Sequence, residues 1–128
     1  FTKVVRVDDH IPYRGQRSYQ IVTPAATYLY HRQGGGFAGL VDPDGNDWIS
    51  YQEGGGSAGE YRGIPNIRPA GFHPGYEDLR SRVLHAGPLK LTFRTETGEG
   101  AWACTWEVYP GYANMTLDRK GEGNYWLL

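Results

Sequence analysis

The sequence predicts an all-β fold, an antiparallel β-sandwich that forms a single domain over residues 1–128 with one long Gly/Pro-rich loop. Its 128 residues are the length of one domain. Nineteen glycines and eight prolines are too many helix breakers for a helix-rich protein. Ten tyrosines and four tryptophans supply the apolar bulk of a core, because each aromatic side chain buries roughly 150–250 Å².

Short runs rich in β-branched and aromatic residues predict strands in the first half of the chain. These runs are 3–7, 19–22, 27–31, 37–41 and 47–51. The last two flank Asp-Pro-Asp-Gly-Asn at 42–46, which is typical of a tight hairpin turn. We therefore expect 37–41 and 47–51 to pair.

The alternation of apolar and polar residues disappears between residues 52 and 88. This stretch contains a glycine-rich run at 54–57 and the three prolines Pro65, Pro69 and Pro74. We expect a short helical turn over 76–81 as its only local element. Long loops inside compact domains are uncommon and often carry function.

Strict alternation returns in the last third and predicts three strands of an antiparallel meander, separated by turns at 97–100 and 110–111. The apolar faces of these strands are Leu89, Leu91 and Phe93; Trp102, Cys104, Trp106 and Val108; and Ala113, Met115 and Leu117. Cys104 shares its face with two tryptophans, which predicts a buried, inert thiol and not a nucleophile.

The last segment, Asn-Tyr-Trp-Leu-Leu at 124–128, is an apolar strand sequence. It either closes a sheet edge or pairs with another chain, so a homo-oligomer through this C-terminal strand is one expectation. Because the chain starts at Phe1 without a leader-like segment, we expect a processed product or part of a longer chain.

Composition also excludes several classes of function. The formal net charge is −1 and no basic block occurs, so nucleic acid is not an expected partner. No apolar run approaches the roughly 18–20 residues that span a bilayer, so no membrane partner is expected. The single cysteine excludes an internal disulfide framework and a cysteine-based zinc cluster.

The loop over 60–82 gathers side chains that could act on a sugar. If a uronic acid were bound, His73 and Tyr61 would transfer protons while Arg62 neutralises the carboxylate. The alternative is that Arg62 and Glu77 are members of structural ion pairs, and that His73 is an ordinary hydrogen-bonded loop residue.

Four further residues are expected to bind the sugar without reacting. Amides and carboxylates hydrogen-bond hydroxyl groups, and aromatic rings stack on the apolar faces of pyranoses. The residues of these types are Asn66, Glu77, Tyr76 and Trp48.

The turn at 42–47 also resembles a calcium-binding loop. Oxygen-bearing side chains occur at the alternate positions Asp42, Asp44 and Asn46, with Glu53 further along. The flanking segments are predicted strands, however, and Asp and Gly are also what a tight hairpin requires. The hairpin is therefore the preferred interpretation, and no cofactor is expected, with Ca²⁺ at this turn as the less favoured alternative.

Two segments carry a family resemblance. Ile-Val-Thr-Pro-Ala-Ala-Thr-Tyr at 21–28 and Gly-Leu-Val-Asp-Pro-Asp-Gly-Asn-Asp-Trp at 39–48 resemble the opening strands of a galactose-mutarotase-like supersandwich. Segments 61–66 and 72–75 are similar to bacterial proteins of carbohydrate degradation. The resemblance implies a reduced or partial supersandwich, because the catalytic glutamate that epimerases carry late in the chain has no counterpart here.

These observations predict a bacterial carbohydrate-active domain, secreted or periplasmic, that binds a glycan or a uronic-acid-containing polysaccharide. It would act by proton transfer, as a polysaccharide lyase or an epimerase. One alternative is a non-catalytic carbohydrate-binding module in which Trp48, Tyr51 or Trp126 stacks on sugars. The other is an assembly domain that pairs through 124–128.

Overall fold

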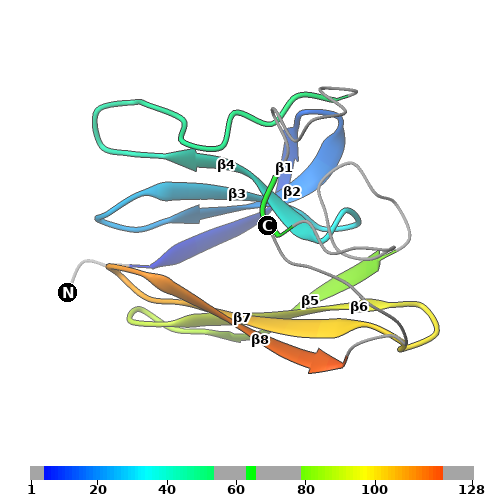
Figure 1. Cartoon of the computed structure of the whole chain (residues 1–128). Helices are drawn as coiled ribbons and strands as arrows, with labels where there is room; N and C mark the ends of the chain where they lie inside the picture. Colours follow the sequence, from blue (N-terminus) through cyan, green and yellow to red (C-terminus); the bar gives the residue numbers. More distant parts are fainter. Residues whose placement is uncertain (1–4, 54–62, 66–78, 120–128) are drawn as a thin grey trace.

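The computed structural model describes residues 5–53, 63–65 and 79–119, which form two four-stranded antiparallel sheets and contain no helix. Figure 1 shows the sheets as two layers, the first drawn in blue to cyan and the second in green to orange. The predicted all-β fold is confirmed, and the architecture is that of a β-sandwich. Among the described residues, no helix has the length and apolar character needed to cross a membrane.

Each sheet is a simple meander, with strands adjacent in the order of the chain. The first sheet consists of β1 (Arg6–Tyr13), β2 (Gln16–Val22), β3 (Thr27–His31) and β4 (Gly36–Val41). The second consists of β5 (Leu79–Ala86), β6 (Leu91–Thr97), β7 (Ala103–Val108) and β8 (Ala113–Arg119). The meander predicted for the last third is thereby confirmed as β6, β7 and β8.

Aromatic side chains from both sheets fill the space between the layers. The ring of Tyr30 lies 4.7 Å from that of Phe93, and the ring of Phe37 lies 4.7 Å from that of Trp106. All four side chains are buried. Cys104 is also buried, and desolvation raises the pKa of its thiol to about 12, so the thiol stays protonated.

A relay of hydroxyl groups joins the sheets beside this core. Ser81 Oγ donates to the carbonyl of Arg32 at 2.6 Å, so it must accept the hydrogen bond from Thr95 Oγ1 at 2.7 Å. The single proton of Thr95 Oγ1 is used in the hydrogen bond to Ser81, so Thr95 Oγ1 accepts the hydrogen bond from the Tyr30 hydroxyl at 2.8 Å. The backbone amide of Leu79 adds a further inter-sheet bond, of 3.2 Å, to the carbonyl of Gln33.

The outer face of the first sheet carries a second packed layer. His31 and Leu29 of β3 are buried there, and the rings of His31 and Tyr51 meet edge to face at 5.3 Å. The Tyr13 hydroxyl reaches over Gly39, where an added Cβ would lie only 3.2 Å from it. A glycine at position 39 thus lets the end of β1 approach β4 closely.

Several predicted elements differ from the observed ones. The 47–51 segment is not a strand; only Asp47 forms an isolated bridge, with Val41. The helical turn predicted over 76–81 is wrong for residues 79–81, which begin β5, while 76–78 lie outside the described residues. The strand predicted at 3–7 is observed later and longer, as β1, with residues 3 and 4 outside the described part.

Candidate functional site

Of the residues predicted to contact a sugar, the structure describes Trp48 and Tyr51. The stacking role that the binding-module alternative gave to Tyr51 is wrong, because this side chain is buried against His31 and only 7% exposed. The others lie outside the described residues, so the roles predicted for them stay predictions; they are His73, Tyr61, Arg62, Asn66, Glu77 and Tyr76. The C-terminal segment 124–128 lies outside as well. The described site is therefore built from the turn that carries Trp48 and from the arginine-rich end of the first sheet.

Trp48 follows the turn after β4, and 74% of its surface is exposed. Its backbone amide donates to the carbonyl of Leu40 at 2.9 Å, and its indole N–H donates to Asp42 Oδ2 at 2.9 Å. The pKa of Asp42 lies below its ordinary value, first because of this indole donor and then because of the donors of Asn46. The aromatic ring is thus held in one orientation while it faces solvent.

A second carboxylate fixes the other side of the same turn. Asp47 Oδ1 accepts from the backbone amides of Leu40, Ile49 and Ser50 at 3.1, 3.0 and 3.0 Å. Asp47 Oδ2 accepts from the Tyr13 hydroxyl at 3.2 Å. Burial raises the pKa of Asp47, but the amide donors together bring it below its ordinary value.

The hairpin interpretation accounts for the hydrogen bonds that these aspartates accept. Asp42 Oδ1 takes the backbone amides of Asp44 and Asn46 at 3.0 and 2.9 Å, and Gly45 adopts a φ of +89°. Among the described residues, no cluster of His, Cys, Asp and Glu is placed to hold a metal ion. Calcium at Asp42, Asp44 and Asn46 stays a prediction.

The tip between β1 and β2 is a two-residue turn with an unusual occupant. Arg14 has a φ of +47° and Gly15 a φ of +90°, the left-handed pair that a type I′ turn requires. Asparagine and glycine are the usual residues there, because a side chain with a longer stem is strained at positive φ. Arg14 therefore adopts a left-handed backbone conformation that arginine disfavours.

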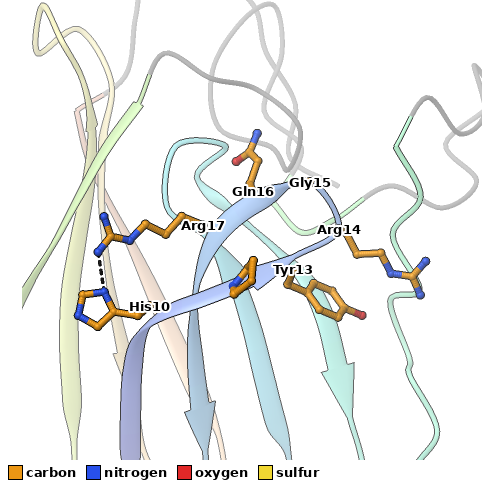
Figure 2. A pocket seen from close by; sticks show the side chains of 7 residues that line it. His10, Tyr13, Arg14, Gly15, Gln16 and Arg17 are labelled. Atoms are coloured by element: carbon orange, nitrogen blue, oxygen red, sulfur yellow. Dashed lines mark hydrogen bonds between the residues drawn. The ribbon is translucent and has the colours of Figure 1, made fainter.

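A pocket of about 610 Å³ lies around this tip. Its lining consists of His10, Pro12, Tyr13, Arg14, Gly15, Gln16 and Arg17. Figure 2 shows His10 and Arg17 bonded on one side of the hairpin, while Tyr13 and Arg14 point to the other side. Arg17 Nη2 lies 2.6 Å from His10 Nδ1 and must be the donor, so Nδ1 carries the lone pair. His10 Nε2 then donates to Asp9 Oδ1 at 2.9 Å.

A second pocket adjoins the first, because Arg17 lines both of them. Its volume is about 280 Å³, and it lies where the two sheets meet. Its lining consists of Arg17, Arg32, Gln33, Leu79, Arg80 and Ser81. Three arginines from different parts of the chain thus line one pocket.

The sequence-based interpretation missed these three arginines. Arg17 and Arg80 stand on β2 and β5, and Arg32 directly follows β3, so only strand pairing and sheet packing bring them together. The one local signal was the alternation over Leu79, Arg80, Ser81 and Arg82, which is typical of a strand with a charged outer face.

His31 lies at the base of the same hairpin tip. It is fully buried, its Nε2 donates to the carbonyl of Tyr13 at 2.8 Å, and its Nδ1 has no hydrogen-bond partner. Burial lowers its pKa to about 4, partly opposed by the bond to Tyr13, so the ring is neutral at pH 7. These contacts give this histidine a structural role.

No protein-family model, curated protein or solved structure matches this chain. The resemblance to the galactose-mutarotase-like supersandwich therefore stays a prediction.

Proposed function

We propose that this chain is a glycan-binding β-sandwich domain in which Trp48 is the sugar-stacking residue. The observation that carries the proposal is that this indole is largely exposed yet held in one orientation by Asp42. A ring that is already oriented loses little side-chain entropy when a ligand binds, which favours affinity. A flat aromatic face suits the C–H face of a pyranose.

The surroundings of Trp48 favour a sugar over a protein partner. Protein interfaces place a hot-spot tryptophan in a pocket surrounded by contacts that exclude water. Here the neighbours along the turn are polar, namely the partly exposed Asp42 and the exposed Asp44 and Asn46. Carboxylate and amide groups of this kind hydrogen-bond the hydroxyl groups that ring a stacked sugar.

We propose binding without catalysis for the described part of the site. His10 is the one exposed imidazole of the tip pocket, and both of its ring nitrogens are engaged, by Arg17 and Asp9. In this arrangement it offers no free lone pair to abstract a proton. Lyase or epimerase activity remains a proposal for His73, Tyr61 and Arg62, with Asn66, Glu77 and Tyr76 orienting the sugar.

A glycan array followed by calorimetry tests the proposal. We expect Trp48→Ala to lower the affinity for the best glycan at least about tenfold, since stacking an aromatic ring contributes on the order of 1–3 kcal/mol in comparable base–aromatic contacts. Tyr112→Ala is the matched control, because Tyr112 is another exposed aromatic, stacked on Tyr109 at the β7–β8 turn. This control should leave the affinity unchanged.

Two results would overturn the proposal: no binding to any glycan, or equal affinity of the native chain and Trp48→Ala. Ultraviolet absorbance of unsaturated products, followed in the same samples, tests the lyase proposal separately. A rise in absorbance that His73→Ala abolishes would add catalysis to binding.

A further inference from the structure

We propose that the pocket lined by Arg17, Arg32 and Arg80 binds the carboxylate of a uronic acid in the glycan ligand. This inference rests on the proposed glycan-binding function and names the class of sugar that the domain selects. It starts from the pocket itself, which sequence patterns did not reveal and which combines side chains of both sheets.

The three arginines differ from the structural cations of the molecule. Lys90 and Arg94 are paired with carboxylates, of Glu107 at 3.5 Å and of Asp118 at 3.5 Å respectively. Among the described residues, no ion pair includes an arginine of the pocket. Grouped like charges without counter-charges repel one another, and a bound anion relieves that repulsion.

Two of the guanidinium groups are oriented by neutral partners. The guanidinium of Arg32 lies 5.0 Å from the centroid of the Tyr19 ring and donates to the carbonyl of Asp9 at 3.3 Å. Arg17 donates to a neutral imidazole, that of His10. These contacts fix the direction of each side chain and leave its positive charge uncompensated, which is the arrangement an anion site requires.

Among the described acidic residues, Asp9 accepts from Arg32 through its backbone carbonyl, and its carboxylate is occupied by His10 Nε2 at 2.9 Å. Glu96 faces Arg80 across the β5–β6 pair, but its carboxylate lies 3.7 Å from Arg94 Nε. Both carboxylates thus have partners outside the pocket.

The geometry favours a carboxylate attached to a sugar over a large polyanion. A guanidinium offers five N–H donors in a planar fork that matches the two oxygens of a carboxylate. A volume of about 280 Å³ admits that group with part of its pyranose ring. The backbone of the pocket is also fixed, because Ser81 and the carbonyl of Arg32 belong to the inter-sheet relay.

Calorimetry with oligogalacturonate and with its methyl ester, which is matched in shape but uncharged, tests this inference. We expect Arg80→Gln to weaken binding of the acid at least about tenfold, as loss of a charge-assisted bond of 1.5–3 kcal/mol implies. Binding of the methyl ester should not change. Arg82→Gln is the matched control, since Arg82 is also exposed on β5, two residues further on and outside the pocket lining.

The outcomes separate this inference from the proposed function. If Trp48→Ala weakens binding of both compounds while Arg80→Gln affects neither, the glycan function stands and the pocket assignment is overturned. Equal losses in Arg80→Gln and Arg82→Gln would also overturn it, because they indicate a diffuse charge effect. Tighter binding of a sulfated glycan than of the uronate would overturn the carboxylate assignment.

Free galacturonate and free galactose, titrated while the arginine side-chain N–H resonances are observed, test the pocket without any stacking contact. Shifts of the Arg17, Arg32 and Arg80 resonances with the acid alone support the inference, even if no glycan binds through Trp48. Equal or absent shifts with the two sugars count against it.

Discussion

Two turns of the first sheet, at residues 13–16 and 42–47, solve the same backbone problem with different residues. Each turn requires residues with a positive φ. In the 42–47 turn this residue is Gly45, whereas in the 13–16 turn both Arg14 and Gly15 have a positive φ. The 42–47 turn has the sequence that turn chemistry favours, with aspartates that accept its own amides. The 13–16 turn lacks such residues at its tip.

The difference lies in what holds each turn. Asp42 and Asp47 stabilise the 42–47 turn through local hydrogen bonds. The 13–16 tip depends on residues that are distant in the sequence. His31 donates to the carbonyl of Tyr13, and Asp47 accepts a hydrogen bond from the Tyr13 hydroxyl. Backbone strain that tertiary contacts maintain is concentrated at functional sites in proteins. Here the strained residue is Arg14, which lines the pocket shown in Figure 2.

Removing the carboxylate that both turns share should have the largest effect on stability. We expect Asp47→Ala to lower the free energy of unfolding by about 3 kcal/mol, because it deprives backbone amides and the Tyr13 hydroxyl of a charged acceptor. Urea denaturation measures the change. Asp47→Asn keeps one carbonyl oxygen and should lose less than half as much; equal losses would show that the charge, and not the acceptor, decides.

Acid should loosen the 13–16 tip through His31. Its pKa is lowered to about 4 in the folded chain, so its contribution to stability is complete above its unfolded pKa and falls as the pH drops below it. Between pH 7 and pH 5 we expect the free energy of unfolding to fall by about 2 kcal/mol from this group. Denaturation of His31→Gln, which keeps an N–H donor, should lack this component; an unchanged pH dependence would contradict the prediction.

Relieving the strain at Arg14 should have the smallest effect, and it should be stabilising. Asparagine tolerates a φ of +47° better than arginine does, so Arg14→Asn should raise the free energy of unfolding by about 1 kcal/mol. Thermal and urea denaturation give the value. Arg17→Asn, next to the tip in β2, has no such strain to relieve and should not stabilise the chain.

Sequence patterns predicted the fold where alternation was strict and failed where side chains redirected the backbone. Leu91, Phe93 and their partners on β7 gave the meander of the second sheet. The run at 47–51 has apolar residues like a strand, but Asp47 binds the amides of Ile49 and Ser50, and Ser50 has a φ of +53°. Amides bound in this way cannot form a regular ladder with β4.

The candidate site was predictable only in its local part. Trp48 could be proposed because a tryptophan beside a polar turn is visible in the sequence. The pocket of Arg17, Arg32 and Arg80 could not, because its formation depends on the register of β2 with β3 and on the contact between the sheets. Strand β5 was missed because only Leu79 of its residues is buried.

The hydroxyl relay between the sheets determines how the molecule responds to substitutions in its interior. Its bonds join Tyr30, Thr95 and Ser81 to the carbonyl of Arg32, a residue that also lines the pocket. If one layer slid past the other by the rise of one residue, about 3.3 Å, the two bonds that cross between the sheets, Tyr30–Thr95 and Ser81–Arg32, would be lost, because such a shift exceeds the range of a hydrogen bond. The hydrogen bonds in the interior therefore set the spacing of the arginines that the two layers contribute to the pocket. We expect substitutions of the buried hydroxyl residues to alter ligand preference before they unfold the chain.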